Sequence, residues 1–85
     1  MEFVIVAFRS RSQTIKLANL LSAHGIPMEI VNTPKEAGVG CGLSVKIKSH
    51  SFEMVKKVVF SLSLSSFAGF FVVKELGGRK IVRSI

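Results

Sequence analysis

Cysteine, aspartate, tryptophan and tyrosine are nearly or wholly missing from this sequence of 85 residues. Cys41 is the single cysteine, so the chain forms no internal disulfide and requires no oxidising compartment. His24 and His50 lie far from it at no ligand spacing, and we expect no metal site. Glycine patterns that bind phosphates or dinucleotides are missing, so we expect no cofactor. Without aspartate, and with glutamates that show no paired arrangement, the chain does not resemble an ordinary hydrolase.

Long apolar runs are missing too. The longest apolar stretch, 58–73, is interrupted by serines and a glycine, whereas a membrane span needs about 20 apolar residues in succession. The N-terminal segment carries Glu2 and no basic region, which is typical of a strand rather than a secretion signal. We therefore expect a cytoplasmic protein with no membrane segment.

Positive charge and apolar residues are abundant by contrast. Twelve lysines and arginines stand against five glutamates, giving a net charge of +7. This balance favours an anionic partner, although the charges are dispersed and a basic surface also serves solubility alone. Apolar residues make up 48% of the chain, which is ample for one small core, and we expect a single domain over 1–85.

The first half of the chain predicts a strand, a helix and two further strands. Residues 3–8 are β-branched and aromatic, as in a buried strand. Ser10 followed by Gln13 fits a capping box, so a helix is expected from Arg11 to near Gly25. Its predicted apolar stripe comprises Ile15, Ala18 and Leu21, widened by Leu17 and Leu20. Strands follow at 27–32 and 43–48, and Ser44 is expected on the outward face of the second one.

The second half predicts a helix and a hairpin. Helical spacing runs through 52–62, with Ser49 or His50 as its N-cap and Glu53 in its first turn. The segment 61–68 fits a helix end, a loop or a strand, and the pattern does not choose among them. A strand is expected at 70–76, and the turn at Gly77 and Gly78 leads into a last strand over 79–85.

This element order indicates an α+β protein with a ferredoxin-like βαββαβ sandwich and an additional C-terminal hairpin strand. In that topology the first two strands run the same way. The turn into the first helix and the loop before residue 43 therefore share one end of the sheet, and Cys41 should approach the helix N-terminus. The extra edge strand favours pairing with a second copy, so we also expect a homodimer.

That end of the sheet suits an anion or a reactive thiol. A helix N-terminus carries unpaired N–H groups and a partial positive charge, which would lower the pKa of the Cys41 thiol and stabilise its thiolate. Gly40 and Gly42 would leave the sulfur uncrowded. The alternative is that Cys41 is a small structural residue at the start of a strand. The predicted anion-binding residues are Arg9, Ser10, Arg11 and Ser12.

The same fold also occurs in RNA recognition modules, which stack bases on aromatic side chains of the first and third strands. Here the strand 43–48 has no aromatic residue, and the basic-glycine-aromatic signature is missing. Lys46 and Lys48 could contact phosphates from that strand. Nucleic acid is nevertheless not the expected partner.

The stretch from Phe8 to Ile47 resembles a family of small bacterial proteins described as selenium/sulfur carrier-like, and the resemblance covers residues 3 to about 60. It rests on a serine-bearing turn after the first strand, the helix end LLSAHGIP, the turn at 33–36 and the sequence CGL at 41–43. The resemblance implies that Cys41 is the characteristic residue of the family. The residues that it implies shape the loop around this cysteine are Thr33, Pro34, Gly40 and Gly42.

One departure from the family pattern concerns the turn after the first strand. That turn usually reads Ser-Thr with a following His or Asp, whereas here it is Ser-Arg-Ser-Gln over 10–13, which is more basic. The implied function is a carrier or accessory protein rather than an enzyme. It would hold a persulfide or perselenide on Cys41 and exchange it with sulfur or selenium donor and acceptor proteins. The alternative is an interaction or regulatory module that binds an anion, RNA or a second protein chain, with Cys41 structural.

Overall fold

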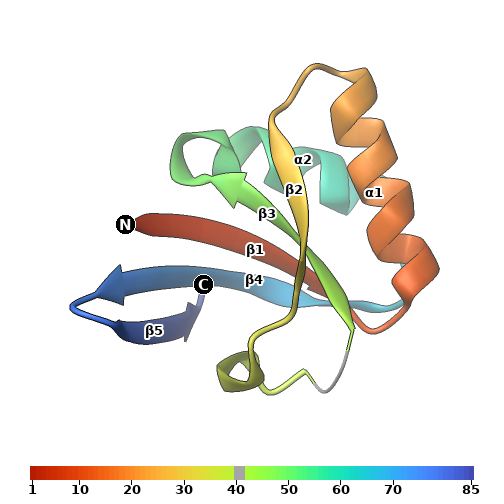
Figure 1. Ribbon diagram of the computed structural model, residues 1–85. Helices are drawn as coiled ribbons and strands as arrows, with labels where there is room; N and C mark the ends of the chain where they lie inside the picture. Colours follow the sequence, from red (N-terminus) through yellow and green to blue (C-terminus); the bar gives the residue numbers. More distant parts are fainter. Residues whose placement is uncertain (40–41) are drawn as a thin grey trace.

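The computed structural model describes residues 1–39 and 42–85 (Figure 1). The elements follow the order βαββαββ, with two short 3₁₀ turns between them. They are β1 (Glu2–Phe8), α1 (Arg11–Ala23), β2 (Met28–Asn32), η1 (Lys35–Ala37), β3 (Leu43–Lys48), η2 (Ser49–Ser51), α2 (Phe52–Leu62), β4 (Phe67–Leu76) and β5 (Arg79–Ser84). None of the helices in these residues is long and apolar enough to cross a membrane.

The strands form one five-stranded sheet in the order β2-β3-β1-β4-β5, and every neighbouring pair is antiparallel. Because β1 and β2 both run opposite to β3, they run in the same direction. The end of β1 at Phe8, the end of β2 at Asn32 and the start of β3 at Leu43 therefore lie at one end of the sheet. The chain is an α+β protein, as the sequence predicts.

One face of the sheet is covered by both helices (Figure 1). Val4, Val6 and Phe8 of β1 point to this side, and they pack with Leu17 of α1 and Val55 of α2 in the larger buried cluster. Five of the seven phenylalanines extend this packing through edge-to-face or tilted ring contacts between β1, α2 and β4, namely Phe8, Phe52, Phe60, Phe67 and Phe70. The helix face thus holds most of the core.

The opposite face is covered by the chain between β2 and β3. Ile5 and Val73 are fully buried there, and Ala37 and Val39 of the connecting segment pack against their cluster. The segment reaches β5, because η1 contacts that strand. Ser44 lies on the face away from the helices, as predicted, because it pairs with Ala7 of this cluster. It is not at the surface, however: this connection closes over it, and Ser44 is fully buried.

Two further expectations are corrected. Ile15 is not in the buried stripe of α1 but 39% exposed, and Thr14 is buried in its place because it faces the start of β3. The N-cap of α2 is Ser51, since Ser49 and His50 form the 3₁₀ turn before it.

The ambiguous segment 61–68 divides into three parts. The helix α2 ends at Leu62, a turn follows, and β4 begins at Phe67, earlier than expected. Ser63 ends the helix in the left-handed region (φ 50°). The hairpin at Gly77 and Gly78 is confirmed, and both glycines have the positive φ that this two-residue turn requires.

Candidate functional site

A surface hollow lies at the sheet end where β1 and β2 finish and β3 starts. Its volume is about 380 Å³, and it is lined by Arg9, Arg11, Asn32, Gly42 and Leu43. These residues belong to the turn before α1, the end of β2 and the start of β3. The antiparallel pairing of β3 with β1 and β2 brings them together although they are about thirty positions apart in the sequence.

The two arginines give the hollow its charge. Both are exposed. The ion pairs among the described residues join Lys46 to Glu29 and Lys74 to Glu2, so neither arginine is paired with a carboxylate there. In the part of the chain that the structure describes, no acidic side chain lines the hollow. Two guanidinium groups beside a helix N-terminus provide an environment that favours a bound anion.

Ser10 begins the helix and does not line the hollow. Its Oγ accepts a hydrogen bond from the Gln13 N–H (3.3 Å) and lies 2.9 Å from the Ser12 Oγ. The cap satisfies one of the N–H groups that a helix leaves without an intrahelical partner. Of the four residues predicted to bind an anion, Arg9 and Arg11 therefore line the hollow, whereas Ser10 and Ser12 form the cap beside it.

The side chain of Gln13 does not complete the expected capping box. Its Oε1 accepts hydrogen bonds from the N–H (2.9 Å) and the Oγ (2.6 Å) of Ser66, and its Nε2 donates to Ser65 Oγ (3.1 Å). Ser66 in turn accepts from the Ser10 N–H through its Oγ (3.1 Å) and from the Arg9 N–H through its carbonyl (2.9 Å). The turn before β4 thus fixes the backbone that carries Arg9. Apart from the serine-rich character of 61–66, no sequence pattern pointed to this network.

Thr14 links the helix to the chain that follows Cys41. Its buried Oγ1 donates to the carbonyl of Leu43 at 2.9 Å, across the gap between α1 and β3. This part-buried hydrogen bond ties the first residue of β3 to the helix. The apolar pattern of α1 did not single out Thr14.

Thr33 closes the connection between β2 and β3. Its N–H donates to the Gly42 carbonyl (3.1 Å), and its Oγ1 lies 2.6 Å from the Oγ of the buried Ser44. Pro34 is the N-cap of η1. Gly42 has φ 135°, a conformation that residues with a side chain rarely adopt, and its backbone passes close to the Phe8 carbonyl. The two remaining predicted residues, Gly40 and Cys41, lie outside the described residues.

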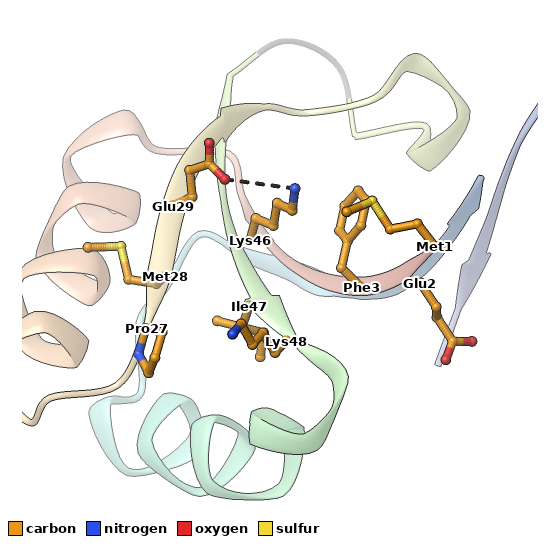
Figure 2. A pocket seen from close by; sticks show the side chains of 9 residues that line it. All are labelled: Met1, Glu2, Phe3, Pro27, Met28, Glu29, Lys46, Ile47 and Lys48. Carbon is orange, nitrogen blue, oxygen red and sulfur yellow. Dashed lines mark ion pairs between the residues drawn. The ribbon is translucent and has the colours of Figure 1, made fainter. Parts of the chain in front are cut away.

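A second hollow, of about 300 Å³, lies at the opposite end of the sheet. Figure 2 shows it between the starts of β1 and β2 and the end of β3. The Lys46 Nζ sits 4.4 Å from the centroid of the Phe3 ring and 3.7 Å from Glu29 Oε1. None of the predicted site residues within 1–39 and 42–85 lines this hollow. Over 1–39 and 42–85, no group of three or more His, Cys, Asp or Glu side chains is arranged to hold a metal ion.

Fold and site together define a small α+β protein in which two arginines at a helix N-terminus face the start of β3. Residues 3–64 match the protein family described as "Putative Se/S carrier protein-like". Since the match covers more than half of the chain, the protein belongs to this family, and the resemblance seen in the sequence is confirmed. The strands β4 and β5 lie beyond the match. No curated protein and no solved structure matches the chain.

Proposed function

We propose that the protein carries a sulfur or selenium atom on Cys41, beside the hollow that Arg9 and Arg11 line. One observation supports this proposal most directly. Gly42, which follows Cys41 in the chain, borders that hollow together with both arginines. Successive Cα atoms are about 3.8 Å apart, so covalent geometry keeps the cysteine close to the cationic end of α1. We also infer a ferredoxin-like arrangement for the first four strands, since their order β2-β3-β1-β4 and their two crossover helices fit it.

The proposed reaction is an exchange between thiolates and a persulfide. The Cys41 thiolate attacks the terminal sulfur of a donor persulfide, the donor's S–S bond breaks, and the donor leaves as a thiolate. A new S–S bond forms on Cys41, and its persulfide is then attacked in the same way by an acceptor thiolate. No net oxidant or reductant is consumed, because the transferred sulfur keeps its oxidation state. The perselenide case differs only in the transferred atom.

The cationic residues around the hollow stabilise the negative charge on the sulfur. The attacking form is the thiolate, and the persulfide carried afterwards is also an anion near neutral pH. Arg9, Arg11 and the N-terminus of α1 stabilise both species through their positive potential. Together with the family's description as carrier-like, this supports a carrier or accessory protein that works between a donor and an acceptor protein.

The test follows the thiol directly. The rate of alkylation of Cys41 is measured against pH, and the intact mass is measured after exposure to a cysteine desulfurase with cysteine. The carrier function requires a thiol pKa below the ordinary value of about 8.5 and a gain of one sulfur atom that is stable to gel filtration. Cys41→Ser is the control: it should keep the far-ultraviolet circular dichroism spectrum of the parent and gain no sulfur.

A different result would favour the interaction module. If Cys41 reacts only after denaturation, its thiol is a buried structural group and the carrier proposal is wrong. Binding of inorganic sulfate or phosphate to the hollow, lost in Arg9→Gln and Arg11→Gln and unaffected by Cys41→Ser, would then assign the site to anion binding alone.

A further inference from the structure

The two edges of the sheet differ in how well they are protected against pairing with another strand. The edges are β2 and β5. Strands at a sheet edge expose N–H and C=O groups, and proteins commonly block them with cationic residues. On β5, Arg79, Lys80 and Arg83 are all exposed. On β2 the only charged residue is Glu29, which pairs with Lys46 of the neighbouring strand.

The hydrogen-bond alternation shows which groups of β2 face outward. In an antiparallel pair, bonded and non-bonded residues alternate. The Thr33 N–H donates to Gly42, one step beyond the register pair of Asn32 with Leu43. Val31 and Glu29 therefore turn their backbone groups to β3. The N–H and C=O groups of Met28, Ile30 and Asn32 turn to the open edge, and Ile30 is the middle residue of the strand.

The side chains beside this edge are apolar on the helix side of the sheet. Ile30 lies opposite the core residue Val45, so its side chain is on the helix side, where it is 42% exposed. Gln13 faces the turn before β4, and Ile15 lies about 200° further round α1, on the flank toward β2. Ile15 is 39% exposed. Figure 1 shows α1 running alongside β2, and the two elements are in contact.

We propose that β2 pairs with β2 of a second copy of this chain, antiparallel about a two-fold axis at Ile30. This places Ile30 opposite Ile30 of the second copy and Met28 opposite Asn32 of the second copy. These are the residues whose N–H and C=O groups face outward. Each of these pairs can therefore exchange backbone hydrogen bonds across the two-fold axis, in the pattern of an antiparallel sheet. Glu29 falls opposite Val31 of the second copy, so no two like charges stand directly opposite each other.

The corresponding pairing of β5 with β5 of a second copy is unfavourable. Antiparallel pairing about the middle of that strand sets Lys80 opposite Arg83 of the second copy, and like charges directly opposite destabilise a strand pair. The dimer expected from the sequence is therefore assigned to β2 rather than to the C-terminal strand. Pro27 and Pro34 limit the pairing to the residues between them, since proline has no N–H to donate.

The test compares two isoleucines with equal exposure on the two edges. Ile30 is 42% and Ile81 44% exposed. We expect the parent protein to dimerise with rising concentration in sedimentation equilibrium, measured with reductant so that Cys41 cannot link two chains. Ile30→Glu should stay monomeric over the same micromolar-to-millimolar range, because it sets two carboxylates face to face, whereas Ile81→Glu should dimerise like the parent. Circular dichroism checks that each variant is folded.

Charge complementation makes the test independent of folding defects. Ile30→Lys alone should also be monomeric, and an equimolar mixture of Ile30→Lys with Ile30→Glu should form a heterodimer, since opposite charges now meet at the axis. In the parent dimer the Asn32 amide, which also faces the open edge, should exchange with solvent more slowly than in either monomeric variant. A parent that is monomeric at millimolar concentration, or loss of the dimer in Ile81→Glu but not in Ile30→Glu, overturns the proposal.

Discussion

The two faces of the sheet are buried by different kinds of structure. On one face α1 and α2 pack against Val4, Val6 and Phe8, and the cover consists of regular helices. On the other face the cover is the segment between β2 and β3, through Ala37 and Val39. This segment leads directly to Gly40 and Cys41 in the sequence. Damage to the helix face should therefore unfold the domain, whereas damage to the other face should first disturb the chain that carries Cys41.

The largest effect is expected from Leu17→Ala on the helix face. Leu17 is fully buried in the main core, and removing such a side chain costs about 2–5 kcal/mol of unfolding free energy. Ile15→Ala is the matched control on the same helix, and it should cost less than about 1 kcal/mol because Ile15 is largely exposed. Urea denaturation of both variants at micromolar concentration measures the difference. Equal losses would show that the buried face of α1 is assigned wrongly.

A smaller loss is expected from Thr14→Val, which tests how α1 is tied to β3. The change removes the hydroxyl that donates to the half-buried Leu43 carbonyl, and the loss of such a hydrogen bond costs about 0.5–1.5 kcal/mol. Thr14→Ser keeps the hydroxyl and should retain most of the stability. Urea denaturation ranks the two, and a Thr14→Ser variant as unstable as Thr14→Val would mean that the methyl group, not the hydrogen bond, matters.

Val39→Ala on the other face should change the pKa of the Cys41 thiol while lowering the unfolding free energy only slightly. Val39 is half-buried, so the loss of unfolding free energy should be about 1 kcal/mol or less. If the packing of this segment holds Cys41 near the helix N-terminus, the pKa of its thiol should rise, and less thiolate should be present at neutral pH. Alkylation rates against pH measure the shift. An unchanged thiol pKa would show that the cover of this face does not position Cys41.

The smallest effect on stability is expected from Arg11→Gln. The guanidinium is exposed and has no carboxylate partner among the described residues, so unfolding free energy should change by no more than about 0.5 kcal/mol. The thiol pKa of Cys41 should nevertheless rise, and added salt should reduce the difference from the parent. Arg83→Gln, on β5, is the control with the same change of charge. If both variants raise the pKa of the Cys41 thiol equally, the effect comes from the net charge of the protein, and the position of Arg11 at the hollow has no special role.

Most of the elements could be predicted from local patterns. The cap at Ser10, the helix end near Gly25 and the glycine pair after β4 are local signals, and each is confirmed. Ile15 was misassigned because several apolar stripes fit α1, and the sheet selects the one that includes Thr14. Ser44 was expected at the surface and is buried, because strand alternation does not reveal that a loop folds back over the outer face of the sheet.

The candidate site was only partly visible in the sequence. The arginines and Gly42 stood out by charge and by position, and the topology indicated that they share one end of the sheet. The contacts that hold this end together were not visible, since Gln13 bonds to Ser66 across more than fifty positions and Thr14 to Leu43 across nearly thirty. Such partners have no local spacing, so no periodicity or motif could point to them.

The sequence by itself determined the family, the α+β class and the order of strands and helices, because apolar periodicity, caps and turn glycines act over a few residues. The tertiary structure decided which side chains cover each face of the sheet, which arginines share a hollow with Gly42, and which edge of the sheet is left open to a second copy. These properties depend on the register between distant strands, and only the packed sheet fixes that register.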